Sequence, residues 1–548
     1  MRPVKPSVRE GSSATWAVLT ACAGVLAWLF AWNPRLLGSW HGFLHAGIAN
    51  SFAHSFPPEN PFFAGEPLPY YWFYHLAGYW LSNTLRLNLL LTFQLISWAS
   101  LAMLVVVAGV IGRRSFRSAA AGVAIACLAL CGLNPLGPAI AAAKNVVRGE
   151  ALVEHWTGPV ETTFVSNVQA DRLMTQPLLG AMYLGGDWRQ GMDLVWFFDI
   201  GSRAPALAGM MLLLYLLLQP GPTVGRGVVI AAVSAAVTAL NPLIGIAVAG
   251  AMGLASILLR RRPEFLLSVA GGLGALLASP TYYQMFFRVS GGGGVGLRTA
   301  MGPVIVGVNF VALVAFAAMG ARKAANPQLT TIALAGTVLL AILAVVHLPE
   351  GNEHNLGNAA QCLLAVPAGA LAAYISRPRA ALILALFVPV TMATLFAYAN
   401  RPAMPIAFAA SKVSRIPADD LQHFYDWVQR ATPRPSIFIV DSAAAVKMSG
   451  NASELPAMTA RMLFTDLPNY LTTPNRDAAL RAQLAGDATR GRELTRAQRE
   501  YLIRLGRPIF VASYRPDNAD RLTSLYGPAL FQNAAVSVFG LAGTQARR

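Results

Sequence analysis

Long apolar stretches recur along the first 398 residues of the chain and are separated by short polar segments. Most contain roughly 17–25 residues, the length of helix that crosses a bilayer. Asn241-Pro242 interrupts a stretch too long for one helix, so we predict a break there. The pattern predicts about eleven transmembrane helices, at residues 14–33, 88–112, 118–140, 204–220, 227–241, 243–259, 264–287, 303–321, 328–348, 359–376 and 380–398.

The pattern changes after residue 398, where short apolar runs alternate with amphipathic segments. This alternation is typical of a small α/β layer. We therefore predict a mainly α, polytopic transmembrane domain at residues 1–398, followed by a soluble α/β domain at residues 399–548. The expected elements of the second domain are a helix at 418–432, strands at 436–442, 508–514 and 534–541, and helices in RDAALRAQLAG and LTRAQREYLIRLG.

Charge patterning orients the predicted helices. Only 12% of the residues are charged, about half the usual share of a soluble domain. The basic clusters of the short loops all fall on one face, which predicts a cytoplasmic face and a cytoplasmic N-terminus. Among the acids before residue 399, only Glu10 and Glu264 fall on that face. The C-terminal domain is then extracytoplasmic, and the protein is expected in the cell membrane. The net charge of +17 favours anionic lipids and lipid phosphates over nucleic acid as partners.

Two long outer loops, 34–87 and 141–203, are the first places to look for function, since long loops in compact proteins are usually functional. In the first loop, His41 and His45 are four residues apart, so a helix would place both on one face. That spacing suits a divalent metal, with His54 or His75 as a further ligand. The alternative is that these are buried or interfacial histidines.

Glu59 and Glu66 are the acids of the first loop. A group transfer to a hydroxyl or amine needs a base to accept the proton, and either carboxylate could serve, although both could equally be solvated loop acids. Tyr70 and Tyr71 open an aromatic run that extends to Tyr74. Such runs are usually interface anchors, and the alternative role is stacking on a sugar or a polyprenyl chain.

Two further polar groups lie at predicted helix ends on the outer face. Arg203 is at the mouth of the fourth predicted helix, where a cation could hold the charge of a phosphate leaving group. Glu353, His354 and Asn355 form a dense polar cluster between two helices, and could contact a lipid phosphate or an acceptor. The alternatives are a surface arginine and a polar turn.

Several of these segments together resemble a known family. The stretch PPENPFFAGEPLPYYWFYH, the HAGIANSF segment that begins at His45, the NPLIG break, the His354-Asn355 pair and the SIFIVDS strand are similar to those of the bacterial GT-C-type integral membrane glycosyltransferases. The resemblance implies a polyprenyl-phosphate-linked sugar donor, an extracytoplasmic acceptor and often a divalent metal such as Mg²⁺ or Mn²⁺. Two positions depart from the family pattern: His41 replaces an acidic residue, and Asn358 replaces a lysine near the lipid phosphate.

The sequence thus predicts a membrane glycosyltransferase that acts on a glycan, lipid or protein acceptor outside the cytoplasm. Glu66, Glu59 and His41 are the candidate catalytic residues, and His41 and His45 the candidate metal ligands. The candidate substrate-binding residues are His45, Tyr70, Tyr71, His75, Arg203, Glu353, His354 and Asn355. Two other readings remain open. A transporter or flippase of lipid-linked saccharides would usually carry mid-membrane charges and internal repeats, neither of which is visible here. A catalytically inactive assembly protein would keep the fold and bind without turnover.

Overall fold

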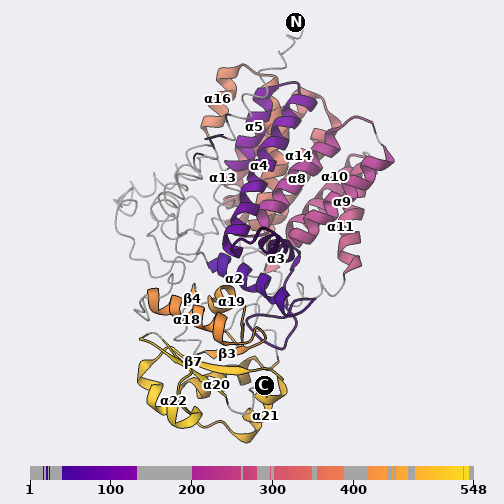
Figure 1. Ribbon diagram of the computed structural model, residues 1–548. Coiled ribbons are helices and arrows are strands. Elements are labelled where there is room, and N and C mark those ends of the chain that lie inside the picture. The colour runs from indigo at the N-terminus through magenta and orange to yellow at the C-terminus, as the bar shows by residue number, and fades with distance from the viewer. Residues whose placement is uncertain are drawn as a thin grey trace.

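The computed structural model consists of a helical bundle, an α/β domain, and two helices of the first outer loop between them (Figure 1). Apart from four isolated residues between 17 and 24, the residues described are 40–132, 200–221, 223–260, 263–279, 296–297, 301–348, 354–387, 418–440, 447–448, 452–466, 476–534 and 536–541.

The bundle helices follow the predicted apolar runs closely, which confirms the polytopic helical fold. Among the residues that the structure describes, three helical stretches are long and apolar enough to cross a membrane, Leu89–Ser115, Pro327–Val345 and Asn355–Ala373, and five shorter helices are also apolar. The predicted helix at 14–33 and the C-terminal parts of those at 118–140 and 380–398 lie outside the described residues. The bundle consists of α4 (Leu89–Ser115), α5 (Ala119–Leu130), α8 (Arg203–Leu218), α9 (Val224–Leu240), α10 (Pro242–Leu258), α11 (Pro263–Ala278), α13 (Met301–Ala324), α14 (Pro327–Val345), α15 (His354–Ala370), η7 (Leu371–Ala373) and α16 (Arg377–Ala385).

The predicted break at Asn241-Pro242 is confirmed, and it separates α9 from α10. The Asn241 side chain caps α10 by accepting a hydrogen bond from the Ile244 N–H, and Pro242 occupies the first turn, where no backbone donor is needed. Asn326 and Pro327 start α14 in the same way, with the Gln328 N–H as donor. The chain therefore uses one Asn-Pro device twice to begin a bundle helix.

Helices α13 and α15 approach each other closely at Gly320. A Cβ atom at this position would lie 1.8 Å from the carbonyl oxygen of Pro367, so only glycine fits. A backbone contact of this kind lets two helices pack without intervening side chains, as is common in membrane bundles.

The α/β domain is built on a five-stranded sheet of order β6-β3-β7-β9-β8. The β6, β3 and β7 strands are parallel, whereas β9 pairs antiparallel with both β7 and β8. Apolar clusters cover both faces of this sheet. The strands are β3 (Ile437–Val440), β6 (Met462–Leu463), β7 (Ile509–Ser513), β8 (Phe531–Gln532) and β9 (Ser537–Gly540), and the helices are α18 (Ala418–Ala431), α19 (Leu455–Thr459), α20 (Ala478–Thr489), α21 (Arg496–Arg504), η8 (Pro516–Asn518) and α22 (Ala519–Tyr526).

Each strand and helix predicted for the C-terminal segment has a counterpart in this domain, so the predicted α/β layer is confirmed. Two small ribbons lie outside the main sheet. They pair β1 (Gly296–Leu297) with β2 (Val346–His347), and β4 (Lys447–Met448) with β5 (Ala452–Ser453).

The first outer loop connects the bundle with the α/β domain. It contains α2 (Trp40–Asn50), η2 (Ser51–Ala53) and α3 (Phe73–Leu85), and α2 packs against α19. Leu44, Ile48, Phe62 and Leu68 are buried in the same apolar cluster as α18, β3 and β7. The sequence predicted a division at residue 398, but residues from the first loop complete the core of the C-terminal layer.

Candidate functional site

A polar network joins the first outer loop to the ends of several bundle helices. Ser202 Oγ, directly before α8, donates a hydrogen bond to Tyr71 Oη at 3.1 Å, and Tyr70 Oη donates to the same atom at 2.9 Å. Asn241 Nδ2, between α9 and α10, donates to Ser202 Oγ at 3.3 Å and makes a longer contact of 3.4 Å with Asn355 Oδ1 on α15. We call these five side chains the polar network.

Beside the network lies a buried histidine pair. His45 Nδ1 and His75 Nε2 are 2.7 Å apart, and the two residues are only 4% and 0% exposed. A ring of aromatic side chains encloses the pair: Tyr74 meets His45 edge-on at 5.5 Å between ring centroids, and Tyr70 meets His75 at 5.7 Å. The hydrogen bond links α2 to α3 and so closes the base of the first outer loop.

His75 is a neutral member of the histidine pair. Burial lowers the pKa of His75 to about 3, so this imidazole carries no charge at neutral pH. A Cβ atom at Gly201 would lie 3.8 Å from His45 Nε2, which places the other side of the His45 ring next to the chain that enters Ser202. The pair can orient hydroxyl groups, and His75 does not supply a positive charge for a phosphate.

Arg203 brings a permanent cation to the edge of the network. It is the first residue of α8, as its sequence position predicted, and it directly follows Ser202. Its Nε and Nη1 atoms are buried. A half-buried guanidinium on the residue that follows Ser202 suits the binding of a phosphate or pyrophosphate oxygen.

Two amides farther into the bundle add unused hydrogen-bonding capacity. Asn309 on α13 and Asn358 on α15 are fully buried, and their Nδ2 and Oδ1 atoms have no hydrogen-bond partner among the described residues. Asn358 follows Asn355 by about one helical turn, so it extends the polar side of α15 beyond the network. Asn358 is also one of the two positions at which the sequence departs from the family pattern.

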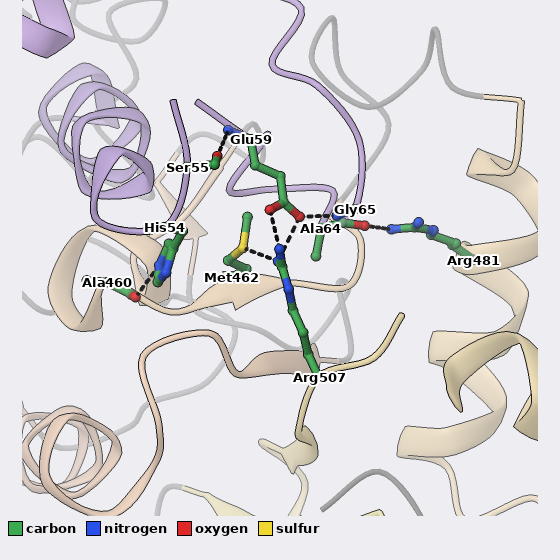
Figure 2. Close-up of polar contacts among 9 residues, drawn as sticks. All are labelled: His54, Ser55, Glu59, Ala64, Gly65, Ala460, Met462, Arg481 and Arg507. Carbon is green, nitrogen blue, oxygen red and sulfur yellow. Dashed lines mark hydrogen bonds and ion pairs between the residues drawn. The ribbon is translucent and has the colours of Figure 1, made fainter. Parts of the chain in front are cut away.

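Glu59 lies at a second place, the contact of the first loop with the α/β domain (Figure 2). Arg507 donates Nη1 to Glu59 Oε1 at 2.8 Å and Nη2 to Oε2 at 2.7 Å. The Gly65 N–H donates to the same Oε1, and Ser55 Oγ accepts from the Glu59 N–H at 3.0 Å. Both carboxylate oxygens of this candidate base are therefore held by an ion pair, and the geometry favours an anchoring role.

Glu66 belongs to a tight hairpin that Glu59 begins. Glu59 and Pro67 form an antiparallel bridge, and the Asn60 N–H donates to the Glu66 carbonyl at 2.9 Å. The Glu66 side chain is half-buried, and within the described part of the chain it makes no ion pair. Of the two acids predicted as bases, Glu66 is the one whose carboxylate is not held by an ion pair with a described residue.

The hairpin extends the sheet of the α/β domain. The Leu463 N–H of the edge strand β6 donates to the Pro61 carbonyl at 2.8 Å, and the Ala64 N–H donates to the Leu463 carbonyl at 2.9 Å. His54 Nε2 contacts the Ala460 carbonyl at 2.9 Å on the other side of the same region. We call this contact of residues 54–68 with the α/β domain the joint.

Arg481 of α20 secures the tip of the hairpin. It is 2% exposed, and its Nη1 donates to the carbonyls of Ala64 at 2.6 Å and Phe464 at 2.8 Å. Its guanidinium carbon lies 4.0 Å from the centre of the Phe63 ring, a cation–π contact. The Nε atom donates to Tyr501 Oη at 2.8 Å. A buried arginine with carbonyl partners thus holds a loop that precedes it by more than 400 residues.

Sequence reasoning missed Arg481, Arg507, Ser202 and the network role of Asn241. One signal for Arg481 was present. Leu484, Ala485 and Ala488 follow it at helical spacing and form the buried face of α20. An arginine that continues such an apolar stripe is unusual and indicates a buried cation with partners from elsewhere.

Three predicted site residues lie wholly or partly outside the part of the chain that the structure describes. The side chains of His41 and His354 and all of Glu353 are not among the described residues. Within the described residues no three His, Cys, Asp or Glu side chains gather as a metal site, and His75 engages Nδ1 of His45. The histidine pair does not by itself provide enough ligands for a metal ion.

Comparison with known proteins agrees with a membrane protein. Residues 11–204 match a family described as "Uncharacterized membrane protein (DUF2298)". This match covers the first outer loop and the second loop up to the start of α8. No curated protein matches the chain.

Solved structures show the likeness of the whole fold. The chain is similar to apo ArnT from Cupriavidus metallidurans, with a TM-score of 0.51 and 12% identity over 98% of this chain and 100% of that one. It is also similar to the same protein bound to undecaprenyl phosphate, with a TM-score of 0.48 and 13% identity over 97% and 99%. A third relative is the arabinofuranosyltransferase AftD from Mycobacteria, with a TM-score of 0.49 and 14% identity over 98% and 40%. The likeness to apo ArnT shows that the chain has the fold of a GT-C glycosyltransferase.

Proposed function

We propose that the protein is a membrane glycosyltransferase that moves a sugar from a polyprenyl-phosphate donor to an extracytoplasmic acceptor. The observation that carries the proposal is the convergence of predicted residues on one buried polar region. His45, Tyr70, Tyr71, His75 and Asn355 come from separate segments and meet at or beside the polar network, and Arg203 directly follows its member Ser202. The GT-C fold agrees with this function, but a fold does not determine function, so the proposal depends on the residues of the site.

The chemistry requires charge at one place and neutral hydrogen bonds at another. The acceptor oxygen or nitrogen attacks the anomeric carbon, the bond from that carbon to the phosphate oxygen breaks, and polyprenyl phosphate leaves. Arg203 would stabilise the negative charge that develops on the phosphate. The tyrosines and the histidine pair would orient the sugar hydroxyls. Glu66 would accept the acceptor proton.

A transfer assay tests this proposal. Purified full-length protein in proteoliposomes would be given a panel of radiolabelled polyprenyl-phosphate sugars, with and without Mg²⁺ or Mn²⁺. The variants are Arg203→Gln, Glu66→Gln and, as a surface control, Arg496→Gln. Arg496 is almost fully exposed and pairs only with Glu500 one turn later. The assay scores both transfer to added acceptors and hydrolysis of the donor.

We expect turnover by wild type and by the Arg496 variant, and a loss of at least about 100-fold in the Arg203 variant, as for removal of a group that stabilises transition-state charge. Loss in Glu66→Gln with an unchanged KM identifies the base. Turnover that survives in both site variants would remove these role assignments. A folded protein that turns over no donor, with or without metal, would contradict the transferase and favour binding or transport.

A further inference from the structure

The first outer loop is fixed at both of its ends, and the two fixations differ. At its base, His45 and His75 hydrogen-bond across the loop, next to Tyr70 and Tyr71 of the polar network. At its tip, the hairpin from Glu59 to Pro67 is bound into the sheet of the α/β domain. The loop therefore spans from the domain to the candidate site.

The ion pair at the joint is suited to setting the position of this loop. It is bidentate, and the Glu59 and Arg507 side chains are only 10% and 27% exposed, so water screens their attraction weakly. Gly65 adds a backbone hydrogen bond to the same carboxylate, which closes the hairpin around it. Glu59 thus connects the hairpin to the segment just before β7, since Arg507 lies two residues before that strand.

The path from this ion pair to the network is short along the chain. Pro67 pairs with Glu59, Leu68 is buried in the α/β core, and Tyr70 and Tyr71 follow at once. A segment this short and packed at both ends transmits a shift of its tip to its base, because packed structure moves in discrete steps rather than deforming gradually.

We propose that Glu59 and Arg507 are positioning residues, which couple the α/β domain to the site by fixing the loop that carries Tyr70, Tyr71 and Glu66. The proposal rests on the glycosyltransferase function above and gives Glu59 a role distinct from that of the base. The α/β domain then acts as a required part of the transferring unit, and its displacement switches off the site without altering a group that touches substrate.

A double-mutant cycle in the full-length protein tests the coupling. The variants are Glu59→Gln, Arg507→Gln and the double variant, with Arg496→Gln and Glu500→Gln as a matched exposed pair in the same domain. The first readout is amide hydrogen exchange of residues 54–72, measured in detergent without substrate. The second is the transfer assay, recorded as kcat, KM and the pH–rate profile.

We expect exchange in residues 54–72 to accelerate about tenfold in each single variant of the Glu59 pair, and no further in the double variant, because the two residues act as a unit. Transfer should fall about tenfold with an unchanged pH–rate profile. The exposed pair should alter neither readout. A Glu59 variant that abolishes transfer and removes a limb of the pH–rate profile, with wild-type exchange, would overturn the positioning role and identify a base.

The exchange measurement separates this proposal from the function. If wild type transfers no sugar but the Glu59 and Arg507 variants release residues 54–72 together, the coupling holds and the transferase reading fails. If the loop stays protected in all variants, the coupling is wrong, whatever the activity. Size-exclusion profiles and the exchange of α20 and α21 report whether each variant remains folded.

Discussion

The joint and the polar network are built from opposite chemistry, although one loop contributes to both. The network consists of uncharged groups: two phenols, a serine hydroxyl and two amides, with the histidine pair beside them. The joint uses ions, with the Glu59–Arg507 pair and the buried Arg481 guanidinium. Each chemistry suits its surroundings.

The difference follows from the cost of burying charge. A charge removed from water is expensive unless paired and hydrogen-bonded, whereas neutral groups that satisfy each other can be buried at modest cost. The network lies at the ends of apolar helices and contains no charged side chain. Arg203, which directly follows Ser202, is the cation next to it in the chain. The joint lies between the loop and a soluble layer, where carbonyls and a carboxylate can surround two arginines. The joint is therefore suited to holding the loop firmly, and the network is suited to adjusting its hydrogen bonds to a ligand.

The largest expected effect is at the joint. Arg481→Ala leaves two buried carbonyls without their donor and removes the cation–π contact with Phe63, so we expect a loss of about 4 kcal/mol in stability. Thermal unfolding of the detergent-solubilised protein measures it. Arg504→Ala on the neighbouring helix, where the side chain is exposed, is the matched control. Equal shifts for both would mean that the joint is not the strong contact.

A substitution inside the bundle should rank second. Gly320→Ala drives a methyl group into the Pro367 carbonyl, which costs about 3 kcal/mol by overpacking. Gly307→Ala in the same helix meets no atom within 4 Å and should be neutral or slightly stabilising. The two variants can be compared by their unfolding midpoints in a denaturing detergent. A tolerated Gly320→Ala would contradict the close approach of α13 and α15.

Acid should destabilise the protein through its buried histidines. The folded-state pKa of His75 is about 3, against 6.5 in the unfolded chain, so its contribution is complete above pH 6.5 and is lost as the pH falls towards 3. At pH 5 this amounts to a loss on the order of 2 kcal/mol. Burial also lowers the pKa of His54 at the joint, which acts in the same direction.

Two variants divide this acid sensitivity between the regions. His75→Gln should flatten most of the fall in unfolding temperature between pH 7 and pH 5, and His54→Gln a smaller part. If His75→Gln keeps the full acid sensitivity of wild type, the conclusion that the buried imidazole of His75 is neutral is wrong.

The smallest effect concerns the network alone. Asn241 and Asn326 both cap a helix in an Asn-Pro pair, but only Asn241 also binds Ser202 and Asn355. Alanine at either position loses the cap, worth about 1 kcal/mol. The excess loss for Asn241→Ala, about 1 kcal/mol, measures the network itself, by unfolding in a denaturing detergent. Identical losses would show that the network adds no stability.

How much the sequence could predict depends on how far apart the partners lie. The bundle helices and the break at Asn241 were predictable because apolar runs and an Asn-Pro cap are local signals. The α/β layer was predictable from its alternating pattern. The polar residues of the loop were found as a set, but their division between two regions was not.

The joint could not be predicted because its contacts join residues about 400 positions apart. Nothing near Glu59 indicates that Arg507 will neutralise it, and nothing near residues 61–64 indicates a sheet edge that needs covering. Ser202 was missed because a serine next to a predicted phosphate-binding arginine carries no sequence signal of its own. Such roles emerge only when helix ends from separate segments meet.

The covering of the β6 edge by residues 61–64 also has a consequence for biogenesis. The ribosome completes the hairpin long before it translates Leu463, Arg481 and Arg507, which bind it. During that interval Phe62 and Leu68 have only Leu44 and Ile48 of their own loop from the shared cluster, and Phe63 lacks the Arg481 guanidinium. The last-made layer thus completes the first-made loop, and a nascent chain that stops early leaves an exposed aromatic hairpin for quality-control proteases to recognise.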